Sequence, residues 1–357
     1  MKKLSAKRFQ YAIADIAAAL QQQIEADCEG FPSDPKASAK RREQALADFT
    51  FFRRTYFPHY CTIPGDSVLH TWLDAALPRM AEAREGQHIA LAAPRGEAKS
   101  TFISLFFVLW CVLTGRKRYI LIIADALEQA AILLEAVKAE LDGNPRLAMD
   151  FPTETGRGRV WNVGTILTAQ NVKLQALGAG KRMRGLRHGP HRPDLVILDD
   201  LENDENVAKP EQRDKLQDWL QKTVLNLGAA DGSMDVVYVG TILHYDSVLA
   251  RTLEKPTWQA KRFRSIVQWP ERLDLWDKWE AILHADGPVA ARAFYDLYQD
   301  DMERGAIVSW PAGRPLYQLM TKRADSHAAF DSEQQNDPLS GDGAPFASCI
   351  TFWVDRS

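Results

Sequence analysis

The sequence HIALAAPRGEAKST, at residues 88–101, decides the fold. Its first six residues are an apolar run with the length of a buried β-strand, and the residues from 98 to 113 predict an apolar helix. A turn that contains Pro94, Arg95 and Gly96 joins the two. Such a turn can direct backbone N–H groups and a helix N-terminus at phosphate groups. The stretch therefore predicts a phosphate-binding loop.

The loop resembles the pattern G-x-x-x-x-G-K-[ST], with Ala93 at the first glycine and Ala98 at the second. In that pattern Lys99 reaches the β- and γ-phosphates of a nucleotide and the Ser100 hydroxyl binds Mg²⁺. The alternative is an ordinary helix start with a solvated Lys99 and a capping Ser100. The position between a buried strand and an apolar helix favours the nucleotide. The expected binding residues are Arg95, Gly96, Glu97, Ala98, Lys99, Ser100 and Thr101.

Further apolar runs alternate with helical patterns after this stretch. The predicted strands are 118–124, two strands within 159–177 joined by a turn at Gln170-Asn171, 194–199 and 234–239. The predicted helices are 125–141, capped by Asp125, and 210–226. This alternation is typical of an α/β fold, with a mainly parallel central sheet flanked by helices.

Composition divides the chain into four segments. An N-terminal helical segment is predicted at 1–58, the α/β core at 59–255, a small tryptophan-rich subdomain at 256–324 and a linker with one strand at 325–357. That last strand, near 350–355, has nothing after it to pair with. We therefore expect the chain to end at the start of a domain that it does not contain.

Charge and cysteine content exclude several classes of protein. The formal net charge of −3 excludes a globally basic nucleic-acid coat, although a local basic groove remains possible. The four cysteines form no CxxC pair, as in a reduced cytosolic protein without a disulfide framework. The N-terminus has no signal-peptide pattern, and the longest charge-free apolar stretch, 100–115, is short of the ~20 residues of a membrane span.

A second predicted site begins where the apolar strand 194–199 ends in Asp199 and Asp200. In P-loop enzymes an acidic strand of this kind is expected beside the P-loop strand. Its last acid holds Mg²⁺ and the next acid orients the attacking water. We assign Asp199 to Mg²⁺ and Asp200 to water activation, with Glu202 as the alternative base. A solvated acidic loop is the simpler interpretation, but it does not explain why the acids begin at the end of an apolar strand.

A basic, glycine-rich segment precedes that strand. Between residues 173 and 192 the chain has six cationic side chains and no acid: Lys173, Lys181, Arg182, Arg184, Arg187 and Arg192. A mobile cationic loop can supply an arginine finger to a nucleotide site or contact a DNA backbone. A solvated basic loop is the alternative. Beyond it, Gly240 and Thr241 end a further strand, where a small polar residue can sense the γ-phosphate.

Taken together, these motifs resemble the large terminase subunit of tailed bacteriophages, the ATPase that drives DNA into preformed capsids. The family's P-loop has an arginine four residues before the lysine, as Arg95 precedes Lys99. Three further motifs are similar to family segments: Gly180, Arg184-Gly185 and Arg192-Pro193-Asp194 before the acidic strand, Gly240-Thr241 after a strand, and Phe330 to Pro338 as F-x-x-E-x-x-N-x-P.

The resemblance implies a P-loop NTPase of the ASCE, RecA-like division with a small lid subdomain, and ATP and Mg²⁺ as cofactors. It implies double-stranded DNA, a portal protein and a small terminase subunit as partners, a homo-oligomeric ring on the capsid, and the host bacterial cytoplasm as location. An arginine acting in trans on the neighbouring subunit matches Arg184 first and Arg187 second. The adenine side matches His59-Tyr60 and the segment from His70 to Leu73.

The family's nuclease half has no counterpart in this sequence. Asp355 is the one candidate for its metal ligands, and a single carboxylate cannot make a two-metal site. We therefore expect no nuclease activity from this chain. Two alternative functions remain: a helicase-like P-loop ATPase acting on DNA, and an assembly or docking module that binds nucleotide without turnover.

Overall fold

The computed structural model describes residues 6–338. The strand predicted near 350–355 and the nuclease candidate Asp355 lie outside these residues.

The centre of the molecule is an eight-stranded sheet with the order β3-β4-β5-β2-β6-β7-β1-β8. Every neighbouring pair in the order from β5 to β8 is parallel, whereas the pairs β3–β4 and β4–β5 are antiparallel. The α/β class with a mainly parallel sheet is therefore confirmed. The strands are β1 His88–Ala92, β2 Tyr119–Ala124, β3 Arg157–Trp161, β4 Thr165–Thr168, β5 Lys173–Gly178, β6 Leu195–Asp199, β7 Asp235–Gly240 and β8 Gln259–Arg262.

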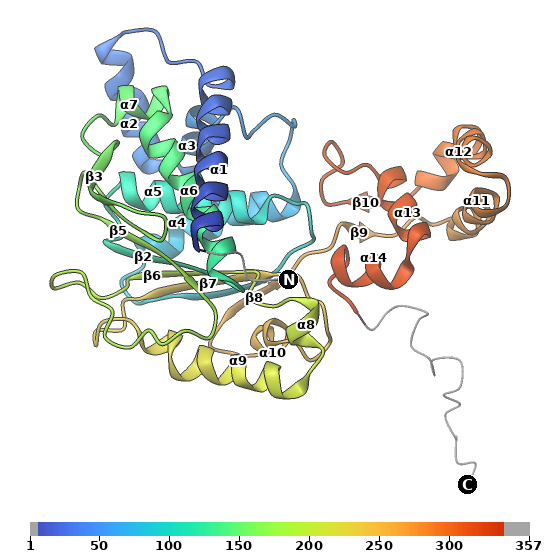
Figure 1. Cartoon of the computed structure of the whole chain (residues 1–357). Coiled ribbons are helices and arrows are strands. Elements are labelled where there is room, and N and C mark those ends of the chain that lie inside the picture. Colours follow the sequence, from blue (N-terminus) through green and yellow to red (C-terminus); the bar gives the residue numbers. More distant parts are fainter. Residues whose placement is uncertain (1–5, 339–357) are drawn as a thin grey trace.

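Helices cover both faces of the sheet (Figure 1). One face carries α1 Ala6–Asp27, α2 Pro35–Ala47, α3 Phe49–Tyr56, α4 Val68–Glu82, the π-helix η1 Thr101–Phe107, α5 Val108–Leu113, α6 Leu127–Gly143 and α7 Pro145–Asp150. The other face carries α8 Asp204–Val207, α9 Pro210–Lys222, the short 3₁₀ turn η2 Val224–Asn226 and α10 Val248–Leu253.

The central strands are buried on both faces, which explains their continuous apolar sequences. Along β2, Ile120 and Ile122 join the hydrophobic core under α4, η1 and α6, whereas Leu121 and Ile123 join the second core under α9 and α10. This alternation follows from the two-residue period of a strand. It fixes which of the two cores each side chain of a central strand enters.

A third core belongs to the C-terminal subdomain, residues 263–337, which lies beside the sheet in Figure 1. It comprises β9 Ile266–Gln268, α11 Leu273–Asp286, α12 Pro288–Glu303, β10 Ile307–Val308, α13 Leu316–Asp325 and α14 His327–Glu333. Trp276 and Trp279 are fully buried in this core.

Four local expectations are wrong. Segment 159–177 contributes to three strands, because the charged and half-exposed edge strand β3 lacks an apolar signal. Asp125 does not cap α6, because its carboxylate accepts hydrogen bonds from Asn203 and Asn206.

The linker predicted from residue 325 contains α14, since Phe330 packs into the subdomain core. Finally, β7 lies between β1 and β6, so the acidic strand is not beside the P-loop strand.

The sheet also continues past residue 255, the predicted end of the core. β8 pairs in parallel with β1 along the residues from Gln259 to Arg262. The chain then enters the C-terminal subdomain directly from the sheet.

Asn336 fastens the end of the C-terminal subdomain to the central sheet. It is fully buried and has a left-handed backbone, with a φ of 53°. Its Oδ1 accepts from the N–H of Ile242 at 2.9 Å, just beyond β7, and its Nδ2 donates to the carbonyl of Phe263 at 2.9 Å, just beyond β8. One amide thus bridges two strand ends.

We expect Asn336→Ala to lower the free energy of unfolding by about 2–4 kcal/mol, because it leaves one buried donor and one buried acceptor unpaired. Urea denaturation of the two proteins measures the difference. Asn226→Ala, at an exposed asparagine on η2, is the matched control and should cost far less. Equal losses in the two variants would contradict the role of the Asn336 amide.

Candidate functional site

The carboxyl ends of β1, β7 and β6 meet at one edge of the sheet because these strands are parallel. The loop 93–98 follows β1, Thr241 follows β7 and Asp200 follows β6. Polar side chains from three distant parts of the sequence therefore converge there. This edge is where ligands bind in open α/β sheets.

The loop after β1 has the backbone of an anion-binding concavity. Gly96 and Ala98 are both left-handed, with φ values of 86° and 53°, and helical backbone begins at Lys99. Among the described residues, the N–H groups of Gly96, Glu97 and Ala98 have no acceptor in the protein. Successive free N–H groups at a helix start form a nest for phosphate oxygens.

Lys99 connects this loop to the two neighbouring strand ends. Its Nζ donates to Thr241 Oγ1 at 3.1 Å and lies 3.2 Å from Asp200 Oδ2. Lys99 therefore contacts both Thr241, which follows β7, and Asp200, which follows β6, although β7 lies between β6 and β1. Asp200 is itself left-handed, with a φ of 46°, a conformation that non-glycine residues rarely adopt and that clusters at functional sites.

Asp199 is buried behind the loop and bonded to two serines. Ser100 Oγ donates to its Oδ1 at 3.0 Å and Ser104 Oγ to its Oδ2 at 2.6 Å. Burial and the charge of Asp200 raise the pKa of Asp199. A serine hydroxyl beside a carboxylate is a hard oxygen donor set of the kind that Mg²⁺ takes. Ser100 and Asp199 therefore fit a Mg²⁺ ion bound with a nucleotide.

Ser104 is a site residue that sequence reasoning missed. It is a polar residue four positions after Ser100 in an otherwise apolar helix, so the two side chains share one face. That spacing was the available signal.

In the part of the chain that the structure describes, no group of three or more His, Cys, Asp or Glu side chains is arranged to hold a metal ion.

Glu202, the alternative base, is committed to other partners. Its carboxylate accepts from the N–H groups of Val248 and Leu249 at 2.7 and 2.9 Å, at the start of α10, and from the hydroxyl of Tyr238 at 3.0 Å. A carboxylate at a helix N-terminus is stabilised there. These contacts favour Asp200, which touches Lys99, as the residue that orients water.

Arg95 is drawn toward the C-terminal subdomain. Its N–H donates to the carbonyl of Glu333 at 2.9 Å, and its guanidinium pairs with the Glu333 carboxylate at 2.7 Å. The side chain remains 66% exposed, so it has room to move. Glu333 belongs to α14, where the sequence predicted a linker.

The two candidate trans arginines lie on a loop that crosses the α9 side of the sheet. Met183 anchors the loop in the core on that side. The imidazole of His188 bonds the carbonyl of Asn171 at 2.9 Å, at the start of β5 and hence at the edge of the sheet opposite to the site. Arg184 and Arg187 are exposed, and within residues 6–338 no hydrogen bond or ion pair holds their guanidinium groups. This chain's own loop 93–98 does not hold them.

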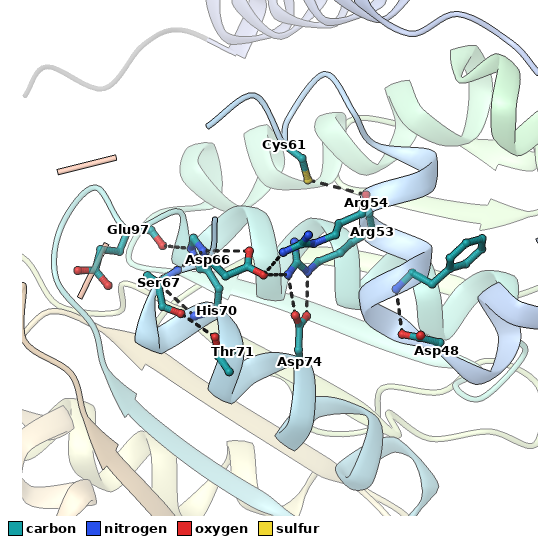
Figure 2. Close-up of polar contacts among 11 residues, drawn as sticks. Asp48, Arg53, Arg54, Cys61, Asp66, Ser67, His70, Thr71, Asp74 and Glu97 are labelled. Atoms are coloured by element: carbon teal, nitrogen blue, oxygen red, sulfur yellow. Dashed lines mark hydrogen bonds and ion pairs between the residues drawn. The ribbon is translucent and has the colours of Figure 1, made fainter. Parts of the chain in front are cut away.

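A cavity of about 300 Å³ adjoins the end of the loop at Ala98, between the α3–α4 connection and η1. Tyr60, Asp66, His70, Phe102 and Trp310 are among its lining residues. The imidazole of His70 stacks on Phe102 with centroids 4.2 Å apart, and its Nε2 lies 3.0 Å from the carbonyl of Glu97 (Figure 2). An aromatic wall beside a phosphate loop suits a planar base.

The arginines and acids of Figure 2 hold α4, and with it His70, in place. Arg53 pairs with Asp74 at 2.6 Å and with Asp66 at 2.7 Å, and Ser67 caps the helix. His59, in contrast, is not in the cavity lining. Its imidazole pairs with buried Glu140 at 2.8 Å, so its place is structural.

Glu97 is the buried acid of the loop. Only 1% of it is exposed, and its carboxylate accepts from the hydroxyl of Ser309 at 3.1 Å. The hydroxyl of Ser265 lies 3.5 Å from the same carboxylate and 3.3 Å from Oε1 of Gln334, and its single proton is shared between them. Burial raises the pKa of this carboxyl to about 7. Both serines belong to the C-terminal subdomain.

No protein-family model matches the chain, and no curated protein matches it either. Among residues 6–338, no helix has both the length and the apolar character needed to cross a membrane. Function is therefore inferred from the site itself.

We expect Ala98→Gly to leave stability unchanged or to raise it by up to about 1 kcal/mol. A left-handed backbone costs an alanine about 1–2 kcal/mol, and glycine offsets this by its own entropy loss of about 0.5–1 kcal/mol. The control is Ala18→Gly, at an exposed alanine inside the helix α1, where glycine costs about 1 kcal/mol. Thermal denaturation should show that only the control loses stability, and equal losses in both variants would contradict a strained Ala98.

The buried Glu97 also predicts how stability depends on pH. Between about pH 4.5 and pH 7 the folded chain retains a proton on Glu97 that the unfolded chain releases, so raising the pH favours unfolding. We expect Glu97→Gln to become progressively more stable than the wild type across this range, with a constant difference above about pH 8. Thermal midpoints of both proteins test this. The exposed Glu85→Gln is the control, and a pH-independent difference in stability between Glu97→Gln and the wild type would contradict the raised pKa of Glu97.

Proposed function

We propose that the chain is a Mg²⁺-dependent P-loop ATPase, and that it is the motor portion of a large terminase subunit that moves double-stranded DNA into a procapsid. The observation that carries the ATPase proposal is the meeting of Lys99, Thr241 and Asp200 at one sheet edge, beside a loop with free N–H groups. The four motifs that resemble the terminase family support the finer proposal.

Each residue has a distinct role in the proposed reaction. The N–H groups of residues 96–98 and the ammonium of Lys99 bind the β- and γ-phosphates. Ser100 and Asp199 would hold Mg²⁺, which supplies charge neutralisation at the phosphate oxygens when it is bound. Asp200 orients the attacking water, and Thr241, which touches Lys99, senses the γ-phosphate.

Further groups are needed to bind the adenine and to neutralise the charge of the transition state. The adenine would lie in the cavity beside His70, and the exposed guanidinium of Arg95 would neutralise phosphate charge. Arg184 would act on the nucleotide of a neighbouring subunit, since this chain's own loop does not hold it. The proposed assembly is a homo-oligomeric ring with a portal protein and a small terminase subunit as partners, in the host bacterial cytoplasm.

The experiment is steady-state ATP hydrolysis with Mg²⁺ over a wide range of protein concentration. We expect turnover per subunit to rise with concentration, to vanish in Lys99→Ala, and to fall about 10³-fold or more in Arg184→Ala, the loss typical of a missing arginine finger. Lys222→Ala, at an exposed lysine of α9, is the matched control and should hydrolyse ATP like the wild type, whereas Arg187→Ala tests the second candidate for the trans arginine.

Two other outcomes would contradict this proposal. ATP binding without turnover at any concentration would favour a nucleotide-binding docking module, a function compatible with an aspartate in place of the commoner glutamate at residue 200. Concentration-independent turnover that Arg184→Ala leaves intact, with stimulation by DNA, would favour a helicase-like ATPase.

A further inference from the structure

Glu97 lies in the middle of the phosphate loop, but its side chain faces away from the phosphate side. In Figure 2 its carbonyl points to His70 while its carboxylate turns in the opposite direction. There it meets Ser309, just after β10, and Ser265, just before β9. The carboxylate therefore contacts the C-terminal subdomain, not the predicted ligand.

Arg314 reinforces the same contact from the subdomain side. Its guanidinium donates to the carbonyl of Arg95, and a Cβ placed on Gly96 would lie 3.2 Å from its Nη1. Arg314 is only 8% exposed, and its positive charge favours the ionised form of Glu97. Any larger residue than glycine at position 96 would press on this arginine.

The backbone around the serines completes the connection. The N–H of Ser309 donates to the carbonyl of Ser265 at 2.9 Å, and the N–H of Val68 donates to the carbonyl of Ser309 at 3.1 Å. The two serines are thus held to each other and to the start of α4. A displacement of the loop would strain all of these contacts together.

Burying a carboxylate between two hydroxyl groups costs free energy, so its value lies in where it holds the backbone. Glu97 lies between the left-handed residues Gly96 and Ala98. With its side chain fixed in the subdomain, its free N–H is fixed in direction as well. A nest whose N–H groups are already oriented binds phosphate without a further ordering cost.

We propose that Glu97 is a positioning residue that ties the phosphate loop to the C-terminal subdomain, so that polyphosphate binding at the loop and docking of that subdomain stabilise each other. This inference rests on the proposed nucleotide site. The linkage is reciprocal: whatever loosens the subdomain contact weakens nucleotide binding, and a bound nucleotide steadies the subdomain.

Hydrogen–deuterium exchange of the full chain, with and without a non-hydrolysable ATP analogue and Mg²⁺, tests the linkage. In the wild type we expect the saturating analogue to slow exchange in the loop 93–101 and also in the subdomain segments 263–268 and 307–314. In Glu97→Ala the loop should still be protected at saturation, whereas the two subdomain segments should lose their protection. The affinity for the analogue should fall about tenfold, the effect of one hydrogen-bonded contact.

Two further variants separate positioning from general instability. Glu97→Gln keeps an acceptor for Ser309 and should restore both the affinity and the subdomain protection. Ser309→Ala leaves the loop sequence intact and should reproduce part of the loss seen in Glu97→Ala. The exposed Glu85→Ala should behave as the wild type.

The outcomes distinguish this inference from the proposed function. A wild-type chain that binds no analogue would contradict the nucleotide site and the linkage with it. A Glu97→Ala chain that binds with wild-type affinity and keeps protection in 263–268 and 307–314 would overturn the linkage alone. Loss of affinity in Glu97→Gln equal to that in Glu97→Ala would also overturn it, because the hydrogen-bonding role would then be excluded.

Discussion

The N–H groups of Gly96, Glu97 and Ala98 are left without acceptors, and the rest of the site is arranged around that fact. Unpaired backbone donors are costly unless water or a ligand satisfies them. The left-handed backbone at Ala98 adds strain to the same turn, whereas Gly96 adopts its positive φ without steric cost. Such a conformation persists only where the surrounding structure holds it. The loop is therefore held from both sides, by α4 and by the C-terminal subdomain.

The two sides use different chemistry. On the α4 side, the neutral and buried His70 reaches the carbonyl of Glu97 and stacks on Phe102, since burial lowers the pKa of its imidazole. On the other side, charged groups dominate: Glu333 on Arg95, and Arg314 beside Glu97. Apolar packing fixes one wall of the loop, whereas the other wall depends on charged contacts with the C-terminal subdomain.

Much of the fold could be predicted because each central strand is buried on both faces and reads as a continuous apolar run. The parallel sense of those strands then places Lys99, Asp199 and Thr241 at one edge without any knowledge of strand order. The order itself is not encoded in local patterns, so β7 between β1 and β6 was missed. The polar edge strand β3 has no apolar pattern, and the polar residues around Phe330 leave α14 without a recognisable helical pattern. Contacts such as Arg95 with Glu333, which are 238 positions apart, have no local signature at all.

The central claim is that residues 93–101 and Asp199 form a Mg²⁺-dependent nucleotide site. Titration calorimetry with ATP, in the presence and absence of Mg²⁺, tests it most directly on the wild type and on Lys99→Ala. The account predicts one ATP bound per chain, tighter binding with Mg²⁺, and loss of binding in Lys99→Ala. Binding that is equal in the two proteins, or absent from the wild type, would contradict it.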